Sequence, residues 1–184
     1  FRRVCPNIDV DLRMVDNAIE PFELLEKGRT DVIFASKQAG FSCDWTPLCQ
    51  DAMYAILPPD YPLDGQETFP IEAFEGKEFL MPYGKFDLDV KAALSANNVK
   101  PKIRPCHVDD ETVIRMVGKG LGLSMMAEMM IRGRTNGVTA VPIEPATGRE
   151  LGMGLHMRES MPDGILRLRE CVLAFIGTLP GTES

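Results

Sequence analysis

The sequence predicts an α/β protein whose chain folds as two lobes built on mainly parallel sheets. Short apolar runs alternate along the chain with segments of helical apolar spacing, which is typical of sheets covered by helices on both faces. The length of 184 residues suits one domain or two small lobes. Prolines at 58–62 and at 142–145 mark the places where the chain is expected to cross between lobes.

The first part of the chain predicts a βαβ unit. Residues 8–14 alternate apolar and polar side chains, which is the period of a strand. Asn17 can start the following helix, which should end at Gly28. The apolar run 32–35 is typical of a buried parallel strand, so the crossover should be right-handed. The inward face of the helix carries Phe22, Leu24 and Leu25.

Further elements follow at regular intervals. A loop at 36–46, anchored by Phe41 and Trp45, leads to a strand at 52–57. Asp163 is expected to cap a terminal helix, whose apolar side carries Ile165, Leu168, Val172, Phe175 and Ile176. Between them the pattern predicts helices at 71–74 and 86–97 and strands at 79–81, 102–108, 138–143 and 150–158.

The segment 107–130, HVDDETVIRMVGKGLGLSMMAEMM, is the centre around which the rest is organised. Asp109 or Asp110 can cap a helix by accepting hydrogen bonds from its free N–H groups. Glycines at 118, 120 and 122 then stop that helix, and a brief strand and a new helix follow. A strand end that leads into a helix N-terminus is where α/β proteins usually bind ligands. The alternative is an ordinary turn whose acidic residues only cap the helix.

Composition and charge argue against several classes of function. The net charge of −7 and the pI near 4.9 do not suit binding to nucleic acid phosphates. No apolar run approaches the roughly 20 residues that span a bilayer, and no signal-peptide pattern opens the chain. The GxSxG, HExxH and Walker motifs are absent, and GKGLGL lacks the spacing of a dinucleotide fingerprint. We therefore expect no catalysis and no cofactor.

The five cysteines form no CxxC pair and, with two histidines, no zinc-ligand pattern. We expect no bound metal, and we interpret the cysteines as buried or incidental thiols of a reducing cytosol. The alternative that the spacing leaves open is a redox pair of Cys43 and Cys49.

Features spread through the chain resemble the effector-binding domain of LysR-type transcriptional regulators. One departure is Met125-Met126-Ala127, where the family commonly has aliphatic residues and a proline. The matching features, in chain order, are Phe1…Pro6-x-Ile8-x-Val10, Leu25…Gly28-x-x-Asp31, Leu48-x-x-Asp51, Leu57-Pro58…Tyr61-Pro62-Leu63, Val108…Glu111-Thr112…Val117-x-x-Gly120-Leu121-Gly122, Val141-Pro142-Ile143 and Arg149.

The resemblance implies a type 2 periplasmic-binding-protein fold, in which two Rossmann-like subdomains are joined by two crossover strands and hold the effector in the cleft. Regulatory subdomain I would comprise 1–57 plus 152–184, and subdomain II 58–151. The family's first strand, the helix after it and the winged helix-turn-helix domain should precede Phe1. The peroxide-sensing branch has its cysteines in the segment matching 83–94, where this chain has none, so a thiol switch is not carried over.

The predicted ligand contacts lie in three segments, 36–37, 82–85 and 108–109, and at His156. An anion would suit Gly84 and Lys85 better than a helix start already occupied by acidic side chains; otherwise the ligand is not strongly acidic. Tyr83 could stack on an effector, Lys85 could instead be a solvated helix-start residue, and His156 could sense pH or be a satisfied histidine. The predicted site comprises Ser36, Lys37, Pro82, Tyr83, Gly84, Val108, Asp109 and His156.

The function that follows is sensing of a small organic effector, a carboxylate or an aromatic compound, by a bacterial cytoplasmic regulator. A homodimer or tetramer is expected, with DNA bound only through a helix-turn-helix domain outside this chain and with no membrane partner. An alternative of the same fold is a transport-type periplasmic solute-binding protein, which would need a secretion signal before Phe1. A third is an enzyme on the same fold, which would transform its ligand.

Overall fold

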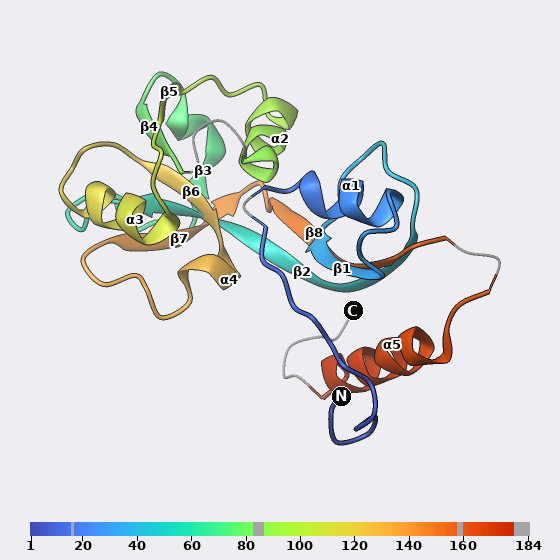
Figure 1. Cartoon of the computed structure of the whole chain (residues 1–184). Coiled ribbons are helices and arrows are strands. Elements are labelled where there is room, and N and C mark those ends of the chain that lie inside the picture. The colour runs from blue at the N-terminus through green and yellow to red at the C-terminus, as the bar shows by residue number, and fades with distance from the viewer. Residues whose placement is uncertain (16, 83–86, 158–159, 179–184) are drawn as a thin grey trace. The chain divides into compact units, whose positions relative to one another are not determined.

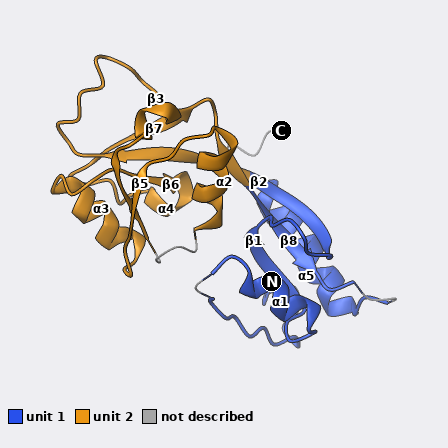
Figure 2. Cartoon of the chain, turned by 90° about the horizontal axis from the view of Figure 1, so that it is seen from above, with its two compact units in different colours: residues 1–49, 150–184 blue, residues 50–149 orange. Residues whose placement is uncertain are grey.

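The chain forms two compact units in a computed structural model that describes residues 1–15, 17–82, 87–157 and 160–178. Unit 1 comprises residues 1–49 and 150–184, and unit 2 comprises residues 50–149 (Figure 2). The chain passes between the units twice, inside β2 (Asp44–Leu57) and inside β8 (Gly148–Leu155), which are neighbours in one sheet. The limits 1–57 plus 152–184 and 58–151 remain a prediction for the regulatory subdomains.

Unit 1 is built on a pair of antiparallel strands, β1 (Val32–Ser36) and β8, whose register runs from Val32 opposite Leu155 to Ser36 opposite Leu151 (Figure 1). The helix α1 (Glu20–Glu26) packs on this pair, burying Phe22 and Leu25 with Ile33. As predicted, Asn17 lies at the start of α1, where its Oδ1 accepts hydrogen bonds from Ile19 N at 3.1 Å and from Glu20 N at 2.8 Å, although the N-cap position itself is Ile19.

The loop that follows β1 is anchored by aromatic rings, as the sequence predicted. The ring of Phe41 stacks on Phe22 with centroids 4.9 Å apart, and the ring centroids of Trp45 and Phe22 lie 6.0 Å apart. These rings and the α1 side chains form the small core of unit 1.

The predicted strand at 8–14 does not form, so the predicted βαβ unit is wrong. Three apolar side chains of this segment are exposed: Val10 by 50%, Leu12 by 84% and Met14 by 98%. Alternation supplies an apolar face, but a strand also needs a neighbour for its backbone groups, and the structure pairs β1 with β8 instead. Because β1 is antiparallel to β8, the parallel assignment of 32–35 is wrong too, and Phe34 is 54% exposed.

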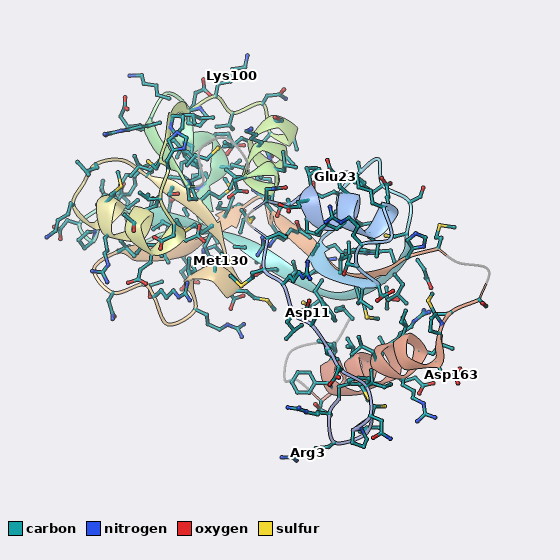
Figure 3. The ribbon with its side chains drawn as sticks, viewed as in Figure 1. Arg3, Asp11, Glu23, Lys100, Met130 and Asp163 are labelled. Carbon is teal, nitrogen blue, oxygen red and sulfur yellow. The ribbon has the colours of Figure 1, made fainter. Side chains whose placement is uncertain are left out.

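The terminal helix α5 (Asp163–Ile176) has the predicted position but not the predicted burial. No α5 residue is buried, and Phe175 is 63% exposed. Asp163, labelled in Figure 3, lies in the first turn of α5 and is not the cap. The N-cap position is Pro162, which makes no side-chain capping bond. An ion pair of 3.2 Å from Arg169 to Asp44 connects α5 to the start of β2. Helical spacing identifies the apolar face of a helix but not what covers it.

The strands of unit 2 pair in both directions, rather than in the mainly parallel way predicted. Strand direction is decided by which neighbours a strand finds, and an apolar run is compatible with either direction. The strands are β3 (Phe69–Pro70), β4 (Glu78–Met81), β5 (Lys102–Pro105), β6 (Ser124–Ala127) and β7 (Thr139–Glu144). Both β6 and β7 pair with β2 in antiparallel direction, and β3 pairs with β7 in parallel. The strands β4 and β5 form a separate, parallel two-stranded sheet.

Helices cover the sheet elements of unit 2 on both faces, as predicted. Phe79 and Met81 of β4 belong to one buried cluster, which includes Phe74 and Val90, while Leu80 between them packs with Val113 in a second cluster. This alternation is the side-chain period of a strand. The helices are η1 (Ile71–Phe74), α2 (Leu88–Ala96), α3 (Asp110–Gly118) and α4 (Glu128–Ile131).

The glycine turn after α3 brings β6 back against β4. Gly120 has a φ of +73°, and at Gly122 a Cβ would lie 2.9 Å from Glu78 O. Leu123 N donates to the same Glu78 oxygen at 2.9 Å. The predicted sequence of capped helix, glycine turn, short strand and new helix is therefore confirmed.

None of the five cysteines forms a disulfide, including Cys43 and Cys49. Burial, followed by the nearby Asp44 carboxylate, raises the pKa of the Cys43 thiol, so the less reactive protonated form is favoured. Within the described residues, no helix has both the length and the apolar character needed to cross a membrane.

Candidate functional site

Two parallel strands of unit 2 end side by side, and each leads toward a helix. Met81 at the end of β4 pairs with Pro105 at the end of β5, and Cys106 N donates to Met81 O at 2.8 Å. The structure thus brings Pro82 to the same edge as Val108 and Asp109, as expected of ligand sites at carboxyl ends of strands. We call Pro82, Asp87, Val108, Asp109 and Asp110 the helix-start edge. Tyr83 and Gly84, also predicted contacts, and Lys85 lie outside the described residues.

Aspartates cap both helices at this edge. Asp87 Oδ1 accepts a hydrogen bond from Val90 N at 3.1 Å at the start of α2. Asp109 Oδ1 accepts one from Thr112 N at 2.9 Å at the start of α3, so Asp109 rather than Asp110 is the cap. Each cap satisfies one of the free N–H groups that a helix N-terminus would otherwise offer to an anion.

The carboxylates of the helix-start edge differ in their protonation equilibria. Burial raises the pKa of Asp87 and of Asp110, and the charges of Asp87 and Asp109 raise that of Asp110 further. Hydrogen bonds from Thr112 lower the pKa of Asp109. Asp110 is only 6% exposed and is the first residue of α3. The edge is therefore rich in acceptors and negative in charge.

Arg149 organises a second group of charges in unit 2. Its Nε and Nη2 donate to Asp51 Oδ2 at 3.0 and 2.9 Å, and its Nη1 donates to Asp89 Oδ2 at 3.2 Å. The other oxygen of Asp51, Oδ1, accepts from Met129 N at 3.0 Å. The sequence pattern did not predict this network, although an acidic residue in a buried strand, such as Asp51, is a sign that a distant cation pairs with it.

In unit 1, Ser36 and Lys37 lie at the end of β1, where both already have partners. Ser36 is 8% exposed, and its Oγ accepts a hydrogen bond from Gln38 Nε2 at 3.0 Å. Lys37 Nζ lies 3.2 Å from Glu150 Oε1, which also accepts a hydrogen bond from Trp45 Nε1 at 2.8 Å. The bond from Trp45, followed by that from Lys37, lowers the pKa of Glu150. A ligand anion would therefore compete with Glu150 for the Lys37 ammonium.

His156 does not lie beside Ser36 and Lys37. It follows Leu155, which is opposite Val32, whereas Ser36 is opposite Leu151 at the other end of the strand pair. The Nδ1 atom of His156 lies 3.0 Å from Met157 O. The antiparallel register therefore separates two parts of the predicted site within unit 1.

Two surface cavities of unit 1 are lined by no predicted contact. One, of about 310 Å³, lies along α1, and the other, of about 400 Å³, lies between α5 and Val4. In the part of the chain that the structure describes, no three His, Cys, Asp or Glu side chains are placed to hold a metal ion.

The chain has two α/β units, and two of its strands run from one unit into the other. In unit 2, helices follow the ends of two paired parallel strands. These features define a type 2 periplasmic-binding-protein-like domain. The chain belongs to the LysR substrate binding domain family, whose sequence model matches residues 1–176. It is a LysR-type effector-binding regulatory domain, as the resemblance implied.

Two curated relatives are transcriptional regulators by name. HTH-type transcriptional regulator TtuA of Agrobacterium vitis is 25% identical over 158 residues, which cover 82% of this chain and 51% of TtuA. The uncharacterized HTH-type transcriptional regulator YybE of Bacillus subtilis is 24% identical over 132 residues, covering 70% of this chain and 45% of YybE. The chain thus spans about half the length of the curated relatives it matches.

Solved regulatory domains share the fold at low sequence identity. The Synechocystis PCC6803 CcmR regulatory domain in complex with 2-PG superimposes with a TM-score of 0.82 at 18% identity, covering 98% of this chain and 89% of that one. The BenM effector binding domain with its effector benzoate gives 0.80 at 19% identity, covering 100% and 85%. The effector binding domain of QuiR in complex with shikimate gives 0.73 at 14% identity, covering 88% and 79%.

Proposed function

We propose that this domain binds a small organic effector at the helix-start edge of unit 2 and thereby controls an attached DNA-binding domain. The observation that carries the proposal is the pairing of β4 with β5, which places the starts of α2 and α3 at one edge. Ligands of open α/β sheets bind beyond the carboxyl ends of the strands. Small ligands in the solved complexes of BenM and QuiR support the same role.

Control of transcription requires the effector to bind two arrangements of the protein unequally. A ligand with equal affinity for both would leave their equilibrium unchanged, however tightly it bound. In the intact protein, the arrangement that the effector prefers would position the attached DNA-binding domains. We propose that these are helix-turn-helix domains, of the kind that the names of TtuA and YybE imply. We propose a cytoplasmic homodimer or tetramer that recognises its effector without transforming it.

The proposed contacts comprise the helix-start edge, Ser36 and Lys37 at the end of β1, and the predicted residues Tyr83, Gly84 and His156. The availability of Lys37 depends on Glu150, because the ion pair of 3.2 Å between them must open or rearrange for Lys37 to meet an anion. Its side chain remains 59% exposed, so little desolvation opposes that rearrangement.

A thermal-shift screen of small organic compounds tests the proposal, because a ligand that binds only the folded chain raises its Tm. A hit should bind in calorimetry and be recovered chemically unchanged by mass spectrometry after long incubation. Val108→Asp at the helix-start edge should abolish binding of the hit, whereas Lys100→Ala, on an exposed residue labelled in Figure 3, should not change its affinity. Equal affinity in both variants, or conversion of the hit to a product, would refute the proposal.

A further inference from the structure

Two consecutive residues of β8, Arg149 and Glu150, make contacts that belong to different units. The boundary between the units lies between them, since unit 2 ends at Arg149 and unit 1 continues from Glu150. Successive side chains of a strand point to opposite faces, so adjacent residues can bind different partners. The two residues therefore anchor β8 on either side of the point where the chain passes from one unit to the other.

Arg149 anchors this point within unit 2. Its guanidinium donates to Asp51 Oδ2 on β2 at 3.0 and 2.9 Å and to Asp89 Oδ2 at 3.2 Å. Asp89 is the second residue of α2, so Arg149 connects β8 to one of the two helix starts proposed to meet the effector. The side chains of Asp89 and Arg149 are 16% and 21% exposed, so water and salt screen this pair less than a surface pair.

Glu150 anchors the same point within unit 1. Its Oε1 accepts a hydrogen bond from Trp45 Nε1 on β2 at 2.8 Å, and Lys37 Nζ lies 3.2 Å from the same oxygen. The backbone adds a further connection, because Lys37 N donates to Glu150 O at 2.8 Å. Lys37 is itself a proposed effector contact, so Glu150 connects β8 to the part of the proposed site that unit 1 contributes.

We propose that Arg149 and Glu150 transmit occupation of the effector site to β8. Asp89 connects the effector to Arg149 in unit 2, and Lys37 connects it to Glu150 in unit 1. An effector that draws Lys37 away from Glu150, or moves Asp89 on Arg149, changes the forces on two adjacent peptide groups of β8. Because the chain passes between its units there, such a change biases their arrangement. The proposal rests on the proposed function and adds a mechanism of regulation to it, in which Arg149 and Glu150 are positioning residues.

Trp45 supplies a readout of the contacts in unit 1, because it is the only tryptophan and its indole N–H donates to Glu150. In the isotope-labelled chain of 184 residues, that group gives a single indole peak in a proton–nitrogen correlation spectrum. Asp89→Asn, which weakens the bond to Arg149 in unit 2, should shift this peak by more than its line width. The matched control is Glu111→Gln, which breaks an exposed arginine–carboxylate pair of unit 2 away from β8 and should leave the peak in place.

A double variant tests the route of the coupling. If the effect of Asp89→Asn passes through Glu150, it should cause little further shift in a chain that already carries Glu150→Gln. The effect should also run in reverse, because coupling between two sites is reciprocal. Lys37→Gln should therefore shift the backbone N–H peak of Val90 at the start of α2. This reverse measurement tests the coupling even where Asp89→Asn fails to fold, since the Lys37 side chain is 59% exposed.

An indole peak that Asp89→Asn leaves in place would overturn the proposal, as would a Val90 peak that Lys37→Gln leaves unmoved. Equal shifts in Asp89→Asn and Glu111→Gln would overturn it too, because only the general charge would then matter. A shift that persists undiminished with Glu150→Gln would exclude Glu150 from the route and overturn the proposal. None of these outcomes bears on whether an effector binds, because the chain is measured without one, and the thermal-shift screen decides that separately.

Discussion

Arg149 donates two hydrogen bonds, at 3.0 and 2.9 Å, to a single carboxylate oxygen of Asp51, whose side chain is 1% exposed. The two residues are 98 positions apart in the sequence, and they lie on the two strands along which the chain passes between its units. The second oxygen of Asp51 holds Met129 N at the start of α4. One ion pair therefore fixes β2, β8 and α4 of unit 2 together.

Arg149→Ala should destabilise the chain strongly, by about 3 kcal/mol, because it leaves the buried carboxylate of Asp51 without a counter-charge. Urea unfolding followed by circular dichroism measures the change. The matched control is Arg115→Ala, which breaks an exposed pair with Glu111 and should cost less than about 0.5 kcal/mol. Equal losses of stability in the two variants would show that the buried pair of Arg149 and Asp51 contributes no more than an exposed pair.

Asp110→Asn should make stability less dependent on pH. Burial raises the pKa of Asp110 in the folded chain above its value in the unfolded chain. At a pH between these two pKa values the folded state binds more protons than the unfolded state, so stability falls as pH rises. At neutral pH the variant avoids this penalty and should have the higher Tm. The gain should shrink as the pH falls to about 4, the ordinary pKa of an aspartate, because wild-type Asp110 is then protonated.

Measuring the Tm of the unmodified chain and of Asp110→Asn at neutral and at acid pH tests whether the gain shrinks as the pH falls. Glu111→Gln serves as the charge-matched control, since its side chain is 53% exposed. A gain for Asp110→Asn that grows on acidification would contradict the raised pKa.

Gly152→Ala should disturb the surroundings of Trp45. A Cβ at this position would run into the Trp45 ring and come within 2.8 Å of Thr46 O. The ring must move, so its 2.8 Å hydrogen bond to Glu150 weakens, and overpacking of this kind costs about 1–3 kcal/mol. Trp45 is the only tryptophan of the chain, so its fluorescence spectrum reports the change directly.

Gly177→Ala provides the comparison for Gly152→Ala. Gly177 has a φ of −62°, and a Cβ there would lie 3.5 Å from Leu173 O and 3.8 Å from Ala174 O, which is ordinary van der Waals contact. Neither the fluorescence nor the midpoint of urea unfolding should change appreciably. An unaltered Trp45 spectrum in Gly152→Ala would mean that the strand accommodates the methyl group without moving the ring.

Phe74→Ala should destabilise unit 2 by about 3–5 kcal/mol, because the truncation leaves a cavity among buried rings. Phe74 is 0% exposed and lies between Phe69 and Phe79, with centroids 4.7 and 5.3 Å away. Phe175→Ala removes the same atoms from a position that is 63% exposed and should change stability by less than about 0.5 kcal/mol. Chemical denaturation of the two variants distinguishes a core ring from a surface ring.

Local features of the sequence were sufficient to predict most helices of the chain. Asn17 accepts hydrogen bonds at the start of α1, Asp109 caps α3, and the glycines after α3 turn the chain as expected. These signals are readable because a cap or a turn involves residues only a few positions apart. The common edge of Pro82 and Asp109 was predicted because each residue follows a recognisable strand, and the two strands end side by side.

Tertiary structure alone decided which strands pair and what covers each apolar face. Residues 8–14 alternate like a strand and remain unpaired, and α5 has an apolar side with no buried residue. The pairing of Asp51 with Arg149 and the burial of Asp110 likewise depend on segments distant in the chain. Periodicity and capping act over one or two turns of backbone, whereas strand direction, burial and ion pairing depend on neighbours that only folding brings together.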